Sequence, residues 1–164
     1  MKAIFHADSE WGIGKNNDLM FSIPKDMKFF RATTLNKVVV MGLNTLRSFP
    51  NGQPLKNRTN IVLCPDDVEG VTTVHNLDEL FAEIKKYPPD DVFVIGGASV
   101  YRALIPYCTE VLVTKVFCSG GADTFVPNLD EDRDFELVFQ SERVEDNGYS
   151  FAFCTYRNLN VKTA

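Results

Sequence analysis

The strongest constraint on the fold of this chain is a repeated order of buried strand, glycine turn and helix. Residues 92–95 form an unbroken apolar run, and Gly96-Gly97 then turns the chain into an amphipathic segment. The order recurs at residues 37–41, where an apolar run ends at Gly42 and a short helical segment follows. Continuous apolar runs are typical of strands covered on both faces, as in parallel sheets. The repeat therefore predicts right-handed βαβ units in an α/β fold.

The remaining segments extend this sheet within one domain. Apolar residues recur at three and four positions between Leu77 and Ile84, which predicts a helix, and Pro24 suits the first turn of another. Apolar and polar residues alternate in the tail around Asn147-Gly148, which predicts an antiparallel hairpin on the sheet edge. Further strands are predicted at 2–7, 60–63, 71–74 and 111–117, and a loop at 8–18. No repeat or domain boundary is visible, so we expect a single domain over residues 1–164.

The acidic composition limits the partners that this chain can bind. Its 164 residues carry a net charge of −5, whereas nucleic acids and anionic membranes select basic surfaces. An apolar content of 45% is sufficient for one packed core. No apolar run approaches the ~20 residues of a membrane span, and the first residues lack the apolar core of a signal peptide. We expect a cytoplasmic monomer with a small-molecule ligand, and no nucleic acid or membrane partner.

The segment 21–30 contains one acid on an apolar helical face. Asp26 follows Pro24 in the predicted first turn, and Met27 and Phe30 lie on the same face because Phe30 is one turn further on. A carboxylate in such a setting can bind a flat heterocycle that donates hydrogen bonds. Taken alone, the segment is better explained by an acid that stabilises a helix start.

Two strand-to-helix turns offer backbone N–H groups to an anion. They lie at residues 41–45 and 95–99, and phosphate is the usual ligand of such helix starts. Neither turn matches the Gly-x-Gly-x-x-Gly fingerprint or a P-loop, so each could also be a simple turn. Together, at the carboxyl ends of parallel strands, they could hold a dinucleotide.

Other polar groups have a functional and a structural explanation. Arg58 precedes a strand and could grip a ligand carboxylate, or could cap its own loop. Thr114 lies in a predicted strand and would bond Asp26 only if the two elements are adjacent. Segment 8–21 has glycine hinges and apolar residues, so it is either a lid or a surface connection. The four cysteines and two histidines have no metal-ligand or nucleophile spacing, so we expect neither a metal site nor covalent catalysis.

The ordered set of motifs resembles the dihydrofolate reductase family from about Ile4 to Tyr156. The motifs that carry the resemblance are Gly12-Ile-Gly14, Ile23-Pro-Lys-Asp-Met-Lys-Phe-Phe30, Thr34-Leu-Asn-Lys37, Val40-Met-Gly42 with Thr45, Pro54-Leu55, Arg58-Thr-Asn-Ile61, Val94-Ile-Gly-Gly-Ala-Ser-Val-Tyr101, and Asp123-Thr124 with Pro127. The resemblance implies a mixed, mostly parallel eight-stranded sheet with about four flanking helices and the C-terminal antiparallel hairpin. It also implies NADPH as hydride donor, 7,8-dihydrofolate as acceptor, and antifolates as possible inhibitors.

The resemblance assigns roles residue by residue. Asp26 matches the acid that holds the 2-amino and N3 edge of the pterin and supports protonation at N5, with Thr114 as its neighbour and Leu19 and Phe21 beside the chemistry. The remaining substrate-binding residues are expected to be Ile4, Phe5, His6, Met27, Phe30, Phe49, Leu55, Arg58, Ile95 and Tyr101, with Arg58 on the α-carboxylate of the glutamate tail. The expected cofactor-binding residues are His6, Ile13, Gly14, Asn17, Leu19, Gly42, Leu43, Asn44, Thr45, Leu63, Cys64, His75, Ile95, Gly96, Gly97, Ala98, Ser99, Val100, Tyr101 and Thr124.

Several positions depart from the family pattern. Leu43 stands where the family often has an arginine near the 2′-phosphate of NADPH, and Pro65 stands where a serine is common. His75 or Lys56 could supply a replacement charge. Phe21 replaces a usual tryptophan and His6 a small alanine, both in the pterin pocket, and Met20 replaces a proline that would restrict the lid backbone.

Two other functions remain open from the sequence. The pyrimidine reductase of riboflavin synthesis shares the sheet and a similar cofactor turn, although segment 24–30 with Arg58 favours folate. A non-catalytic folate or nucleotide binder would also be consistent with the changed pocket residues. Retention of Asp26, Thr114 and both glycine turns favours the reductase.

Overall fold

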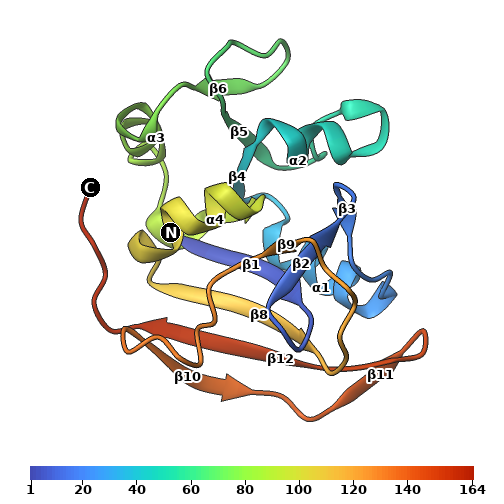
Figure 1. Cartoon of the computed structure of the whole chain (residues 1–164). Coiled ribbons are helices and arrows are strands. Elements are labelled where there is room, and N and C mark those ends of the chain that lie inside the picture. The colour runs from blue at the N-terminus through green and yellow to red at the C-terminus, as the bar shows by residue number, and fades with distance from the viewer.

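The computed structural model describes all 164 residues as one mixed sheet with flanking helices and a small second sheet (Figure 1). Eight strands follow the order β10-β12-β8-β1-β7-β4-β5-β6, and β11 pairs with β12. The bounds are β1 Lys2–Ala7, β4 Val38–Gly42, β5 Thr59–Leu63, β6 Thr72–Val74, β7 Val92–Gly96, β8 Glu110–Val116, β10 Phe135–Gln140, β11 Val144–Asp146 and β12 Tyr149–Asn158. The strands from β8 to β6 pair in parallel, and β10, β11 and β12 pair antiparallel. The predicted α/β fold is confirmed.

Helices cover both faces of the sheet, which explains the unbroken apolar runs. The bounds are α1 Pro24–Thr34, α2 Leu43–Ser48, α3 Leu77–Ile84 and α4 Ala98–Leu104, with short 3-10 turns at Pro50–Gly52, Pro89–Asp91 and Ile105–Tyr107. Val38 and Val40 of β4 belong to the main core, which includes Leu104 of α4. Val39 and Met41 belong to a second cluster on the other face. Because adjacent side chains point to opposite faces, β4 is buried on both sides.

The two predicted glycine turns lie side by side at the carboxyl edge of the sheet. Strands β4 and β7 are parallel neighbours, and Met41 is in register with Gly96. Gly96 has φ = 133°, a conformation that L side chains rarely adopt. A Cβ on Gly42 would lie 3.2 Å from a methyl carbon of Val100 in α4. Glycine at these positions therefore permits both the turn geometry and the close approach of the two segments.

The prediction of a plain loop at residues 8–18 was wrong. The segment contains β2 (Gly12–Lys15) and β3 (Asp18–Leu19), and β2 also pairs with β9 (Thr124–Phe125) in a three-stranded sheet. Asn16 and Asn17 both have positive φ and form the two-residue connection between β2 and β3, as a type I′ hairpin turn requires.

The C-terminal hairpin differs in detail from the prediction. The turn at Asn147-Gly148 connects β11 with β12, while β10 pairs with the distal part of β12. Strand β12 is an inner strand, since its other side pairs with β8, and β10 forms the edge. Strand β12 is ten residues long, so it can serve two short partners in succession on one side. No helix in this fold has the length and apolar character to cross a membrane.

Candidate active site

Asp26 lies in the first turn of α1 and faces two polar side chains from the sheet. Pro24 occupies the first position of the helix, as predicted, and Asp26 lies in the turn where the helix dipole favours an anion. The hydroxyl of Thr114 donates to Oδ1 of Asp26 at 2.6 Å, and Nδ1 of His6 lies 3.0 Å from Oδ2. His6 and Thr114 are register partners on the parallel strands β1 and β8, so both side chains leave the same face of the sheet.

Aromatic rings enclose this polar group. The side chains of His6 and Asp26 are only 6% and 14% exposed. The ring of Phe21 lies 5.7 Å from that of His6 and 4.9 Å from that of Tyr149. A carboxylate surrounded in this way is poorly screened, so its hydrogen bonds to a ligand are stronger than in water.

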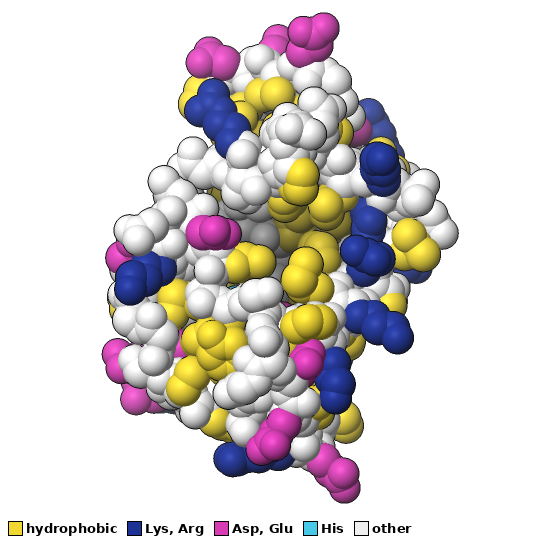
Figure 2. Space-filling model, turned by 90° about the vertical axis from the view of Figure 1, so that its right-hand side faces the viewer, with side chains coloured by type: hydrophobic (Ala, Val, Ile, Leu, Met, Phe, Trp, Pro, Cys, Tyr) yellow, Lys and Arg dark blue, Asp and Glu magenta, His cyan; other side chains and the backbone are white.

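The side of the molecule that carries α1 and α2 is hollowed. Figure 2 shows a depression with an apolar lining and several Lys and Arg side chains along one rim, on the side of the molecule where α1, α2 and β3 lie. Met27 is 53% exposed, and Phe30 on the same helix is half-buried. The half-buried side chains of Phe49, Leu55 and Ile95 pack against the cluster around Met41.

Ile4 and Phe5 of β1 contact Tyr101 of α4. The ring of Phe5 lies 5.0 Å from that of Tyr101, and the Tyr101 hydroxyl donates to the carbonyl of Ile4 at 2.8 Å. Burial raises the pKa of Tyr101 above the ordinary value for a phenol. Tyr101 is therefore a neutral donor that ties α4 to the strand before His6.

Arg58 joins the end of α1 to the loop before β5. Its guanidinium donates to the Thr34 hydroxyl at 3.2 Å, to the Arg31 carbonyl at 3.1 Å and to the Lys56 carbonyl at 2.7 Å. Burial, and then the positive charge of Arg31, lower the pKa of Arg58. Arg58 therefore caps its own loop, as the structural explanation predicts. It also lies at the end of α1, near Phe30.

The glycine turns lie close to a hydroxyl of α2. A Cβ on Gly96 would lie 3.1 Å from the Thr45 hydroxyl, and one on Gly97 would lie 3.7 Å from it. The turns therefore bring bare backbone next to a hydroxyl at the start of α2. The remaining predicted members of this group are Asn44 in α2 and Ala98, Ser99 and Val100 in α4. Bare backbone beside a hydroxyl is the kind of surface that binds a phosphate group.

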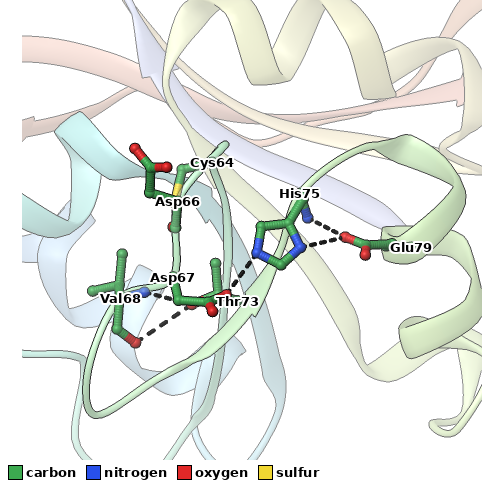
Figure 3. A network of polar contacts seen from close by, with 7 residues as sticks. All are labelled: Cys64, Asp66, Asp67, Val68, Thr73, His75 and Glu79. Atoms are coloured by element: carbon green, nitrogen blue, oxygen red, sulfur yellow. Dashed lines mark hydrogen bonds and ion pairs between the residues drawn. The ribbon is translucent and has the colours of Figure 1, made fainter.

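The far end of the same sheet edge carries an exposed charge cluster (Figure 3). Leu63 and Val74 are register partners at the ends of β5 and β6, with Cys64 and His75 directly after them. Nε2 of His75 lies 2.6 Å from Oδ1 of Asp67, and Nδ1 lies 2.8 Å from Oε2 of Glu79. The hydrogen bond to Asp67, followed by that to Glu79, raises the pKa of His75.

The ends of β5 and β6 are less suited to a 2′-phosphate than the two glycine turns are to a pyrophosphate. His75, one of the two proposed replacement cations, is already shared by two carboxylates. The other, Lys56, precedes the opposite end of β5 from Cys64. Leu43 adds no charge at the start of α2. The charges at this end therefore fit a 2′-phosphate weakly.

The predicted lid residues meet in the small sheet. Gly14 is paired with both Leu19 and Thr124, and Ile13 is adjacent in β2. Asn17 lies in the hairpin turn, and Leu19 is 64% exposed. Trp11, by contrast, is buried against Tyr156 and does not belong to a mobile apolar surface.

Two residues near the site were missed from the sequence. Asp8 is buried after β1 and accepts from the backbone N–H groups of Glu10, Gly12 and Gly120. The bond to Glu10, two residues on, is the Asx-turn pattern, so a turn-forming aspartate at a strand end was a usable signal. Tyr149 contacts Phe21 from β12, and no local pattern indicates that contact.

Comparisons with known proteins agree with this geometry. The family model described as dihydrofolate reductase matches residues 1–158. The chain is 34% identical to a dihydrofolate reductase of Bacillus subtilis, with 98% of this chain and 96% of the relative covered. It is 33% identical to one of Neisseria meningitidis, with 88% and 89% covered.

A solved structure shows the same fold. It is described as a dihydrofolate reductase from Enterococcus faecalis complexed with NADP(H) and RAB-propyl, and it superposes with a TM-score of 0.84 at 34% identity. The alignment covers 96% of this chain and 95% of that one. The match over nearly the whole chain, together with the enclosed acid and paired glycine turns, establishes that this chain belongs to the dihydrofolate reductase family.

Proposed function

We propose that this protein reduces 7,8-dihydrofolate to 5,6,7,8-tetrahydrofolate with NADPH. The observation that carries the proposal is the enclosed carboxylate of Asp26, to which Thr114 donates at 2.6 Å. Asp26 lies on α1, the helix on the side of the molecule that carries an apolar hollow (Figure 2). A pterin presents two adjacent donors, the 2-amino group and N3–H, which a carboxylate can accept together. Family membership over nearly the whole chain supports the same reaction and does not favour the pyrimidine reductase.

Asp26 has two tasks in this reaction. It orients the pterin through the 2-amino and N3 edge, and its charge supports protonation at N5, where the product gains a proton. Thr114 orients the carboxylate by donating to Oδ1. Arg58 grips the α-carboxylate of the glutamate tail from the end of α1, and the half-buried apolar walls, among them Phe30 and Leu55, exclude water around the ring.

The cofactor residues would hold NADPH along the carboxyl edge of the sheet. The nicotinamide supplies a hydride to C6 of the pterin when it is bound. The backbone at Gly96 and Gly97 and the Thr45 hydroxyl would hold the pyrophosphate, and residues at the ends of β5 and β6 would hold the adenosine. Closure of the β2–β3 hairpin with Leu19 would bring an apolar side chain towards the reacting rings and exclude water.

The test is NADPH oxidation followed at about 340 nm with dihydrofolate, in the wild type and in Asp26→Asn. We expect turnover in the wild type and a fall in kcat/KM of roughly a hundredfold or more at neutral pH in the variant, the range for loss of acid–base support. Asp130→Asn is the matched control, because Asp130 also accepts from a hydroxyl, that of Tyr156, without belonging to the site.

Two results would contradict the proposal. Absence of dihydrofolate-dependent oxidation in the wild type would exclude the reductase and leave a binding protein, whereas full activity of Asp26→Asn would exclude the role of the acid. Reduction of a ribosylaminopyrimidine instead of dihydrofolate would support the riboflavin enzyme.

All proposed site residues come from one chain, so we also propose a monomer, with a mass near 18.5 kDa in solution. The four free cysteines suit a reducing cytoplasm.

A further inference from the structure

The chain contains a long stretch without an acidic residue. Residues 27–65 carry six Lys and Arg side chains, whereas all 22 Asp and Glu residues lie outside this stretch. Lys37 pairs with Asp91, and none of the other five cations lies within ion-pair distance of a carboxylate. A chain with a net charge of −5 therefore concentrates unpaired positive charge in one segment, which runs from α1 to the end of β5.

Three of these cations converge at the end of α1. The guanidinium of Arg58 donates to the backbone carbonyls of Arg31 and Lys56, so the backbone of both residues lies against it. The Arg31 and Lys56 side chains are exposed. Burial, and then the positive charge of Arg31, lower the pKa of Arg58, as expected where like charges are close. No carboxylate of the chain offsets this repulsion, whereas a bound anion would.

The positive charge continues along α1 on the hollowed side of the molecule. Arg31 follows Met27 by one helical turn and Lys28 by three residues, so each of these pairs shares a face of the helix. Met27 is 53% exposed, and Lys28 is exposed as well. Figure 2 shows several Lys and Arg side chains along one rim of the apolar depression on the side where α1 and α2 lie. An anion attached to a ligand in this depression would therefore meet cations at its rim.

Arg58 has donors left for one carboxylate. Three of its five N–H groups are used by the Thr34 hydroxyl and the carbonyls of Arg31 and Lys56. The two that remain equal in number the oxygens of a single carboxylate. The glutamate tail of dihydrofolate has two carboxylates, α and γ. With the α-carboxylate on Arg58, the γ-carboxylate and any group attached to it are left to the neighbouring cations.

We propose that Lys28, Arg31 and Lys56 form a subsite for additional carboxylates, so that the preferred substrate is dihydrofolate extended by further γ-linked glutamates. This inference rests on the proposed function of the pocket. Each added glutamate contributes one more carboxylate. The extension has to be γ-linked, because an α-linked one would convert the carboxylate held by Arg58 into an uncharged amide. The subsite therefore selects both the length of the tail and its linkage.

The test compares three substrates at low salt: dihydrofolate, and two forms with three further glutamates, one γ-linked and the other α-linked. We expect the wild type to have a KM about tenfold lower for the γ-linked form than for dihydrofolate, the size expected from a few exposed ion pairs. The α-linked form should gain nothing, and kcat should be the same for dihydrofolate and its γ-linked form. The advantage of the γ-linked form should shrink as salt rises from about 0.02 M to about 0.2 M, since exposed charges are screened.

Neutral variants locate the effect. Arg31 and Lys56 hold Arg58 through their backbone carbonyls, so Arg31→Gln and Lys56→Gln leave those bonds in place. Each of these variants, and Lys28→Gln, should reduce the γ-linked advantage two- to threefold, roughly, and the triple variant should remove most of it. Arg31→Lys keeps the charge and should retain the advantage. Lys85→Gln is the matched control, because Lys85 is also exposed, without a carboxylate partner, and lies beyond α3.

Three results would overturn the inference. The first is an equal KM for dihydrofolate and its γ-linked form in the wild type. The second is an advantage that the α-linked form shares, which would indicate attraction of any polyanion. The third is an advantage that persists in the triple variant, because the extra carboxylates would then bind elsewhere. A wild type that does not reduce dihydrofolate itself would instead overturn the proposed function.

Discussion

The two ends of the proposed site differ in how their polar groups are held. At the pterin end, Asp26 is enclosed and bonded by partners from two neighbouring strands. At the adenosine end, His75 is exposed and held between the carboxylates of Asp67 and Glu79 (Figure 3). Burial strengthens each bond at the first end, whereas solvent screens each bond at the second. Single substitutions should therefore have large effects at the pterin end and small effects at the adenosine end.

After Asp26→Asn, the largest effect expected in this comparison is that of Arg58→Leu. Removing a charged partner of a carboxylate should raise the KM for dihydrofolate roughly thirtyfold, while the KM for NADPH stays the same. Steady-state kinetics with both substrates measures this. Arg58→Lys should recover little, because a single ammonium cannot replace the planar fork.

A truncated substrate separates binding from structure in this variant. Arg58 also donates to Arg31 and Thr34, so Arg58→Leu will loosen the end of α1 as well. Dihydropteroate lacks the glutamate tail, and we expect wild type and variant to use it with similar kcat/KM. An equal loss with dihydropteroate would show that Arg58 acts only by supporting α1.

The next largest effect is expected for Thr114→Val. Valine keeps the shape but removes the donor 2.6 Å from Oδ1, which should lower kcat/KM for dihydrofolate about tenfold. The cofactor dissociation constant should not change. Thr109→Val is a suitable control, since Thr109, which directly precedes β8, also donates from its hydroxyl, to the Met1 carbonyl, away from the site. A similar fall in the control would indicate a general loss of stability.

The difference between the two ends also explains what the sequence could predict. The strands of the sheet and the helices α1 and α3 follow from the local spacing of apolar residues, and the two turns follow from the backbone freedom of glycine. All of these elements were predicted. The small sheet was missed because β2 needs β9, more than a hundred residues away, as a partner. Asn16-Asn17 was the local signal for its hairpin turn.

Contacts between side chains required the three-dimensional arrangement. The pairing of Asp26 with Thr114 was considered only on the condition that the elements are adjacent, and the register of β1 and β8 meets that condition. The bond between His6 and Asp26 depends on the same register and on how α1 packs, neither of which is local. His75 was expected as a possible replacement cation, but its two carboxylate partners come from a loop and from α3.

Leu43→Arg tests the adenosine end directly. An arginine at the start of α2 should lower the KM for NADPH by a few-fold, at most about fivefold because exposed charge pairs contribute little. The KM for NADH should not change, since NADH lacks the 2′-phosphate. Parallel assays with both cofactors measure the ratio. A gain that is equal for NADPH and NADH would place residue 43 away from the phosphate.

The smallest expected effect concerns His75 and pH. Its carboxylate partners raise the pKa of His75, so the imidazolium persists somewhat above the ordinary value of about 6.5 and is lost as pH rises through the raised value. The ion pairs of His75 thus stabilise the folded chain fully below the ordinary pKa and cease to do so above the raised one.

The KM for NADPH should increase two- to threefold, roughly, across this window, while that for NADH stays constant. His75→Gln should abolish the difference, and Asp67→Asn should lower the KM for NADPH by removing a charge that competes with the phosphate. A change of ten- to a hundredfold in either variant would show that this exposed end is as tightly coupled as the pterin end.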